Sequence, residues 1–154
     1  MTQVPPDEPL GSHVLELEVT DVVAETDDSR SLVFGVPPAG ADIPADRLRY
    51  APGQFLTLRI PSDRTGSVAR CYSLCSSPFT DDALTVTVKR TADGYASNWL
   101  CDHAHRGMKI HVLAPSGTFV PKTLDTDFLL IAAGSGITRC WPSASRRSRR
   151  AAAR

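Results

Sequence analysis

Short stretches in which apolar and polar residues alternate, separated by turn-forming residues, recur over most of the chain. In the first of them Leu15, Leu17 and Val19 alternate with Glu16 and Glu18. Such alternation is typical of a strand with one buried face. It predicts strands over 13–25 (with a bulge near residue 21), 31–36, 55–60, 68–76, 84–89 and 108–114, and a helix over 97–104. We therefore expect an all-β fold, a small six-stranded antiparallel Greek-key barrel with one capping helix.

A different pattern begins after the sixth predicted strand. Residues 128–133 form an apolar run without alternation, which is typical of a buried parallel strand, and the turn G-S-G-I-T follows at 134–138. We interpret this segment as the first strand of an incomplete α/β nucleotide-binding domain. The expected organisation is a flexible leader over 1–12, the barrel over 13–122, the truncated domain over 123–138 and a basic tail over 139–154.

The chain's net charge of zero is the sum of a positive C-terminal tail and a negative remainder. The tail holds six arginines and no acidic residue, which leaves 11 bases against 17 acids in the rest of the chain. A negative body has no general attraction for nucleic acid. Because the tail starts in the middle of the glycine turn, we interpret it as out-of-frame sequence. The alternative is a genuine basic arm that binds nucleic acid or an acidic partner.

The composition of the chain indicates in which cellular compartment it is expected and whether its cysteines form a metal site. No apolar run reaches the length of a membrane span, and the first eight residues lack the apolar core of a signal peptide. A cytoplasmic protein with reduced cysteines is expected. Cys71 and Cys75 are four residues apart, a spacing that fits neither a zinc site nor the cysteine run of a plant-type 2Fe-2S cluster. No metal site and no catalytic histidine are predicted.

Two segments carry residue types that suit a flavin. In R-C-Y-S-L, over 70–74, Arg70 can pair with a pyrophosphate, Tyr72 can cover the ring system, and Ser73 can hydrogen-bond the ring edge. In G-Y-A-S-N-W-L, over 94–100, the turn leads into a helix that Ser97 or Asn98 could cap, and such a helix start attracts phosphate. An amphipathic strand with a surface arginine and an ordinary capped helix are the alternatives.

The order of the motifs R-x-Y-S, G-x-x-S-N-W-L, P-S-G-x-F and L-L-I-A-A-G-S-G-I-T is more specific than any one of them. It resembles the flavin domain of the ferredoxin–NADP reductase superfamily, which includes flavin- and iron-sulfur-dependent oxygenase reductases, over about residues 12 to 138. The family has a proline after G-I-T where this chain has Arg139. The resemblance implies a cofactor-binding set of Arg70, Tyr72, Ser73, Leu74, Val88, Lys89, Arg90, Gly94, Ser97, Asn98 and Thr138.

Within that set the resemblance implies separate roles. The pyrophosphate would pair with Arg70 and sit in a cradle of Gly94, Ser97 and Asn98, and the backbone of 88–90 would contact the flavin. Lys89 and Arg90 could equally be solvated charges. Thr138 would lie near the nicotinamide-facing side of the flavin.

The complete protein implied by this resemblance moves a hydride from NADH or NADPH to FAD. It then passes single electrons through a 2Fe-2S centre, expected only in a missing C-terminal part, to a terminal oxygenase. FAD rather than FMN is implied by the resemblance alone, because no adenine pocket is visible in the sequence. We expect no nucleic-acid or membrane partner. The alternatives are a non-catalytic flavin-binding module whose basic tail docks an acidic partner, and a fragment without a stable fold.

Overall fold

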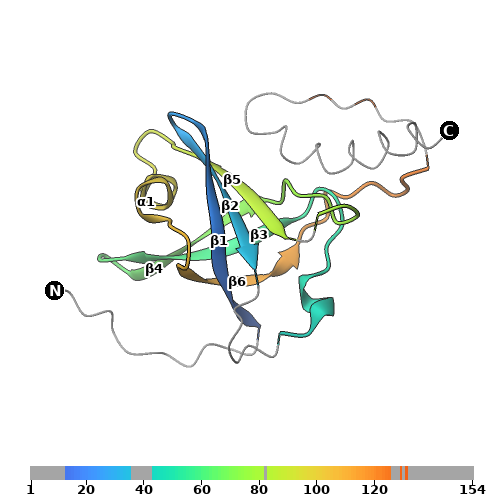
Figure 1. The fold of residues 1–154 in the computed structure, drawn as a ribbon, viewed down its shortest axis with the longest axis horizontal. Helices are drawn as coiled ribbons and strands as arrows, with labels where there is room; N and C mark the ends of the chain where they lie inside the picture. The colour runs from blue at the N-terminus through green and yellow to red at the C-terminus, as the bar shows by residue number, and fades with distance from the viewer. Residues whose placement is uncertain (1–12, 36–42, 82, 126–128, 130, 132–154) are drawn as a thin grey trace.

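A computed structural model describes residues 13–35, 43–81, 83–125, 129 and 131 (Figure 1). The described residues fold into a curled antiparallel sheet with one α-helix beside it. The elements are β1 (Val14–Thr26), β2 (Ser29–Gly35), the 3-10 helix η1 (Ala45–Leu48), β3 (Phe55–Ser62), β4 (Gly66–Ser73), β5 (Leu84–Lys89), α1 (Tyr95–His103) and β6 (Lys109–Ser116). The predicted six-stranded Greek-key barrel with one capping helix is confirmed, and most strand bounds differ from the prediction by one or two residues.

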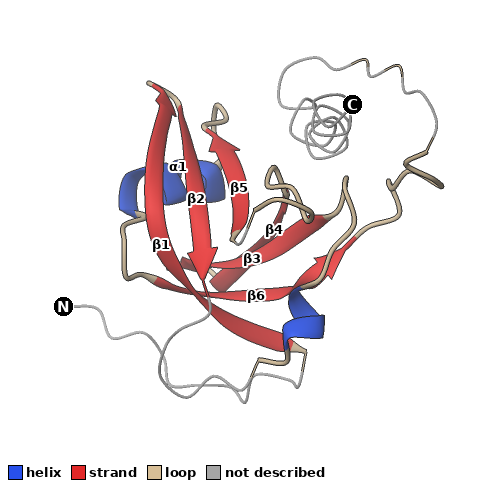
Figure 2. Ribbon diagram, turned by 45° about the vertical axis from the view of Figure 1, so that its right-hand side comes forward, coloured by secondary structure: helices blue, strands red, loops and turns tan. Residues whose placement is uncertain are grey.

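The strand order is β4-β3-β6-β1-β2-β5, and every neighbouring pair is antiparallel. The two strands at the ends of this order come together through a bridge between Leu74 and Val86, which curls the sheet into a barrel. Figure 2 shows β1 crossing the molecule so that it serves both halves of the sheet. Its first half pairs with β6 and its second half pairs with β2. The predicted strand over 68–76 thus ends earlier, and its last residues form this closing junction.

The bend that lets β1 serve both halves lies at the predicted bulge. The register between β1 and β2 shifts between Val19 and Asp21. Before the shift, Leu15, Leu17 and Val19 are buried in strict alternation, and after it the strand is largely exposed. A bulge places two residues opposite one, which bends the strand and increases its twist. The predicted bulge near Asp21 is confirmed.

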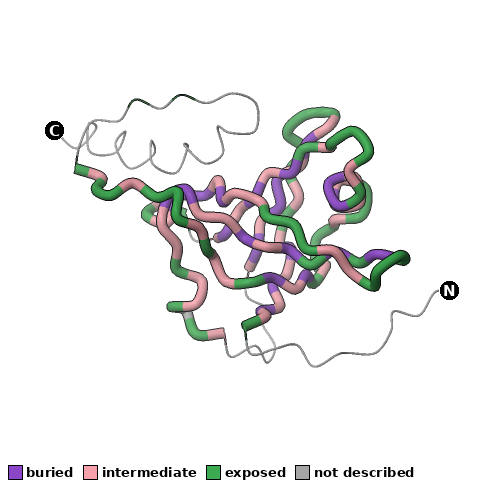
Figure 3. Tube along the Cα trace, turned by 180° about the vertical axis from the view of Figure 1, so that it is seen from behind, coloured by how far each residue is buried: buried purple, intermediate pink, exposed green. Residues whose placement is uncertain are grey.

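The core lies inside the barrel and under α1. Alternate residues of the strands point inward, and Figure 3 shows buried positions alternating with more accessible ones along the trace. The largest fully buried side chains include Phe34, Leu17, Leu56, Leu58 and Leu74. Each contributes about 1.5–3 kcal/mol by leaving water, so the fold depends mainly on these strand faces.

The helix α1 differs from its prediction at the N-terminus. It begins at Tyr95, and its N-cap is Gly94, which makes no side-chain capping bond. Ser97 and Asn98, predicted as capping residues, lie inside the helix, so the capping prediction is wrong. The helix packs on the barrel through Ala96, Ser97 and Leu100. None of the helices that the structure describes is both long enough and apolar enough to span a membrane.

The segment predicted as a buried parallel strand over 128–133 falls mostly outside the described residues. The structure describes two of its positions, Leu129 and Ile131, and neither is in a strand. Their exposed fractions are 86% and 85%. Thr138 and the basic tail over 139–154 also lie outside the described residues.

Candidate functional site

The free edge of β4 presents Arg70 and Tyr72 on the inner face of the sheet. Tyr72 pairs in register with Leu56, and Arg70 pairs with Leu58. Paired residues of an antiparallel sheet share a face, and both leucines are fully buried. Arg70 nevertheless is exposed, because β4 ends the strand order and leaves the inner face open there. Its guanidinium Nη1 donates to the Ala69 carbonyl at 2.8 Å.

The phenol of Tyr72 lies between this edge and the helix. Burial raises the pKa of Tyr72, while the charge of Arg70 lowers it to a smaller extent and Cys101 of α1 raises it slightly. These effects make Arg70 and Cys101 the electrostatic neighbours of the ring. The phenol is therefore neutral at ordinary pH, and its half-buried ring offers a flat apolar surface beside a guanidinium.

Ser73 points to the other face of β4. It pairs with Phe55, whose ring packs so closely on Gly117 that a Cβ added there would lie 2.9 Å from Phe55 Cε1. Strand alternation thus separates Ser73 from Arg70 and Tyr72. A ligand that used all three residues would have to lie across the end of β4, where the strand gives way to the junction at Leu74.

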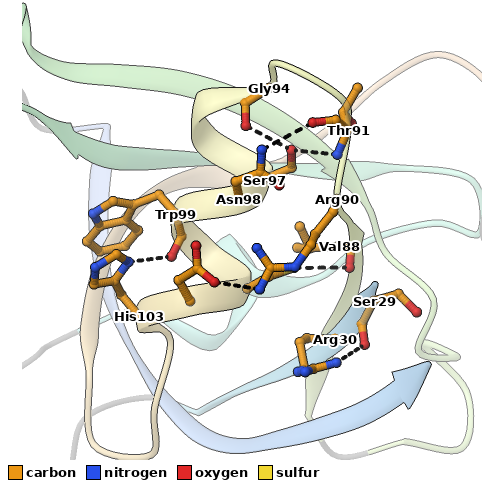
Figure 4. A network of polar contacts seen from close by, with 12 residues as sticks. Ser29, Arg30, Val88, Arg90, Thr91, Gly94, Ser97, Asn98, Trp99 and His103 are labelled. Atoms are coloured by element: carbon orange, nitrogen blue, oxygen red, sulfur yellow. Dashed lines mark hydrogen bonds and ion pairs between the residues drawn. The ribbon is translucent and has the colours of Figure 1, made fainter. Parts of the chain in front are cut away.

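The end of β5 packs directly against α1. The side chain of Val88 is fully buried, and its carbonyl accepts a weak hydrogen bond from the Cys101 thiol at 3.8 Å. Lys89 pairs with Asp28 at 3.1 Å, and Arg90 pairs with Asp102 at 2.5 Å (Figure 4). The two cations predicted as cofactor neighbours therefore use their side chains to tie β5 to the β1–β2 hairpin and to α1.

The turn before α1 is closed by side chains of the helix. Ser97 Oγ accepts from the Thr91 N–H at 3.2 Å and donates to the Gly94 carbonyl at 3.4 Å. Asn98 Nδ2 donates to the Thr91 carbonyl at 3.2 Å. Figure 4 shows these three contacts converging on the turn. Because both side chains are used within the turn, the capacity of this helix start to bind phosphate lies in the backbone N–H groups of its first turn.

Gly94 is required sterically in this turn. A Cβ at Gly94 would lie 2.8 Å from Ser97 Oγ and 2.9 Å from Thr91 Cβ. The helix start also contacts the end of β3, because Tyr95 Oη donates to the Pro61 carbonyl at 2.7 Å. A guanidinium and an aromatic ring on β4 and a glycine-bordered helix start on α1 thus lie on neighbouring elements, and we call the surface between them the opening. This set fits a ligand that combines a flat ring with a diphosphate.

Among the described residues, a cavity and a shallow hollow flank the barrel, and neither is lined by Arg70 or Tyr72. One, of about 420 Å³, lies among η1, the end of β2 and the loop before β5. There Tyr50 Oη and buried Ser76 Oγ are 2.7 Å apart, and burial raises the pKa of Tyr50 to about 12. The other, a shallow hollow of about 400 Å³, lies on the outward face of α1 and is lined by Asp93, Gly94, Tyr95, Asn98, Trp99, Asp102 and His103.

The hollow contains a feature that the sequence reasoning missed. The rings of Trp99 and His103 stack with centroids 4.9 Å apart and planes inclined by 16°. His103 Nδ1 lies 2.9 Å from the Trp99 carbonyl oxygen. The spacing of four residues within a predicted helix was the available signal, since such residues are neighbours on one helix face. Among the residues that the structure describes, no cluster of His, Cys, Asp or Glu could hold a metal ion.

Comparison with known proteins gives consistent results. Residues 16–120 match the family model described as oxidoreductase FAD-binding domain. The ferredoxin reductase component of 3-ketosteroid-9-alpha-monooxygenase from Mycolicibacterium smegmatis is 84% identical over 132 residues, which are 86% of this chain and 37% of that protein. The Rhodococcus rhodochrous protein of the same name is 65% identical over 130 residues, which are 84% of this chain and 36% of that protein.

The fold agrees with these relatives. The solved structure of phthalate dioxygenase reductase, described as a modular structure for electron transfer from pyridine nucleotides to [2Fe-2S], superposes with a TM-score of 0.73 at 27% identity. The match covers 88% of this chain and 40% of that one. The chain therefore spans somewhat more than a third of the length of these curated relatives.

Proposed function

The chain belongs to the oxidoreductase FAD-binding domain family, and we propose that it is the FAD-binding part of an NAD(P)H-dependent electron-transfer reductase that serves an oxygenase. The observation that supports this most directly is the opening between β4, β5 and α1. There the exposed guanidinium of Arg70 lies beside the half-buried ring of Tyr72, and the start of α1 contacts the neighbouring strand β3. A relationship to reductase components favours this reading over a non-catalytic docking module.

In this proposal the residues of the opening bind and orient the flavin. Arg70 pairs with the diphosphate, for which a guanidinium offers two parallel hydrogen bonds, and the start of α1 supplies backbone N–H donors. Gly94 allows the tight turn that precedes this helix start. Tyr72 lies against the ring system or the ribityl chain and excludes water from one of its sides.

Some of the remaining predicted residues would contact the flavin ring, and the others hold the surrounding backbone in place. Ser73 and the backbone at Leu74 and Val88 lie at the junction of β4 and β5, where they would reach the ring edge. Lys89 and Arg90 contribute through their backbone, since their side chains hold Asp28 and Asp102. Ser97 and Asn98 hold the turn before α1 in place through side-chain hydrogen bonds to Thr91 and Gly94. When bound, FAD itself supplies hydride acceptance and the release of single electrons.

The wider assignments extend beyond the described residues. We propose that residues 13–122 are the FAD-binding barrel, that 1–12 are a leader, that 123–138 with Thr138 begin a nucleotide-binding domain, and that 139–154 are an aberrant basic tail. By analogy with relatives named as 3-ketosteroid-9-alpha-monooxygenase components, the electron acceptor would be a steroid-hydroxylating terminal oxygenase. NADH or NADPH would be the donor. A 2Fe-2S centre would belong to the part of such proteins that this chain does not match, and the compartment would be the cytoplasm.

Visible absorbance of the purified chain with added FAD tests the proposal. We expect a bound-flavin spectrum that remains with the protein on gel filtration. Because the chain matches only somewhat more than a third of the length of its relatives, NADH added without oxygen should bleach the bound flavin slowly or not at all, whereas dithionite should bleach it fully. A folded chain that takes up no flavin would refute the proposed function.

A further inference from the structure

The hollow on the outward face of α1 continues from the proposed phosphate position. Gly94 borders both the helix start and the hollow. The hollow then extends along the helix over Asn98 and Trp99, which share one face of α1 with Tyr95. A ligand whose diphosphate lies at the start of α1 therefore has an adjoining space of about 400 Å³ for the group attached to the far phosphate.

The surface of the hollow suits a flat ring. Figure 4 shows the rings of Trp99 and His103 projecting from α1 on the side away from Val88. The stack is held in place, because His103 is also bonded to the Trp99 carbonyl. Trp99 is partly exposed and His103 is exposed, and sequence-tolerant recognition of nucleobases uses aromatic faces that a base can reach. A purine that joins this stack meets an arrangement that is already formed before the ligand arrives.

The charges in the hollow favour a neutral nucleoside over a further phosphate. Two carboxylates line it, Asp93 and Asp102, and Asp102 is already paired with Arg90. Carboxylates repel phosphate but accept hydrogen bonds from ribose hydroxyls. Asn98 uses its Nδ2 on Thr91, which leaves its amide oxygen as an acceptor for an exocyclic amine.

We propose that this hollow is the subsite for the adenosine part of FAD, with the purine on the Trp99–His103 stack and the ribose toward Asp93. The inference rests on the proposed flavin site. It assigns Trp99 and His103 as the residues that make the chain select FAD over FMN, which has the same ring and one phosphate but no adenosine. Neither residue was part of the predicted cofactor-binding set.

The test is a pair of titrations of the full chain, one with FAD and one with FMN. Quenching of the flavin fluorescence measures binding in both. Stacking of one base corresponds to a preference for FAD of about ten- to a hundredfold. Trp99→Leu should remove most of this preference and leave FMN affinity unchanged. His103→Ala changes an exposed residue, and it should reduce FAD affinity severalfold while FMN affinity stays unchanged. This variant tests the adenosine subsite if Trp99→Leu does not fold. Phe79→Ala removes an exposed aromatic ring outside the hollow and should leave both affinities unchanged.

The outcomes separate this inference from the proposed function. A wild-type chain that binds FAD and FMN equally well, or folded variants that lose both flavins in parallel, would overturn the adenosine subsite and leave the flavin site standing. A folded chain that binds neither flavin would overturn both.

Discussion

Leu74 and Val86 form a bridge that joins the two ends of the strand order and closes the barrel. The bridge is supported by backbone bonds from Leu74 N to Gln54 O at 3.0 Å and from Cys75 N to Thr85 O at 2.9 Å. It lies one residue after Ser73 and two before Val88. The chain segments proposed to hold the flavin therefore meet at this bridge, and no further pairing joins β4 to β5 among the described residues.

Leu74→Ala should weaken both the fold and the site. The side chain of Leu74 is fully buried, so truncation leaves a cavity and should lower the free energy of unfolding by about 2–5 kcal/mol. Leu113→Ala is the matched control because Leu113 is 43% exposed, and its cost should be below about 1 kcal/mol. Urea unfolding followed by far-ultraviolet circular dichroism measures both. Equal costs would contradict the role of Leu74 in closing the core.

Gly94→Ala should reduce flavin binding through steric crowding in the turn. The added methyl group would lie 2.8 Å from Ser97 Oγ, and overpacking of this kind costs about 1–3 kcal/mol. Gly107→Ala serves as the comparison, because a Cβ there meets nothing within 4 Å although its φ is +85°. We expect Gly107→Ala to lower stability through its backbone and to leave FAD affinity unchanged. Isothermal titration with FAD distinguishes the two, and an unaffected Gly94 variant would argue against a phosphate site at this turn.

The ion pair between Arg90 and Asp102 should make a pH-dependent contribution to stability. The hydrogen bond from Arg90 holds the pKa of Asp102 below its ordinary value of 3.8. A lowered pKa means that the stabilisation is present above about pH 4 and is lost as the pH falls through the pKa of the folded state. Asp102→Asn should therefore lower the melting temperature slightly at pH 7 and have no effect in strong acid.

High salt should reduce the effect of Asp102→Asn at pH 7, because both side chains are partly exposed and the pair is screened. Asp63→Asn is a suitable control, since Asp63 has no ion pair among the described residues. Its melting temperature at pH 7 should stay close to that of the wild type. A melting difference for Asp102→Asn that persisted unchanged at low pH would show that the pair does not act through its charge.

Tyr50 should make the fold sensitive to alkali. Burial raises its pKa from 10.0 to about 12, so above pH 10 the unfolded chain loses this proton while the folded chain keeps it. Stability is then lost progressively between pH 10 and about 12. Tyr50→Phe should cost about 0.5–1.5 kcal/mol at pH 8 through loss of the bond to Ser76. The gap between variant and wild type in urea unfolding should narrow by pH 11, and a constant gap would contradict the prediction.

The fold was predictable because its strands each bury one face. Alternation located the strands and the bulge at Asp21, and glycine and proline marked the turns. Strand alternation also places Ser73 opposite to Arg70 and Tyr72, although the motif R-x-Y-S does not reveal this by itself. The closing bridge between Leu74 and Val86 could not be predicted, because it depends on how far the whole sheet curls.

The details of the site depended on contacts between residues far apart in the chain. Serine is a residue type that often caps helices, but the hydroxyl of Ser97 accepts a hydrogen bond from the Thr91 N–H, and the N-cap is Gly94. The sequence alone does not show whether the side chains of Lys89 and Arg90 face a cofactor or water. Their partners Asp28 and Asp102 lie on other elements, and only the packing of the hairpin and of α1 brings them into reach.

A FAD titration of two matched arginine variants tests the proposed site most directly. Arg70 and Arg59 are both exposed and lie on adjacent strands, but Arg59 is on the outer face, where its Nε donates to Ser67 Oγ at 2.9 Å. We expect that the wild-type chain binds one FAD, that Arg70→Ala weakens binding about tenfold or more, as loss of a charge-assisted bond implies, and that Arg59→Ala binds like the wild type. Equal affinity for FAD in the two folded variants would contradict the assignment of the flavin to this opening.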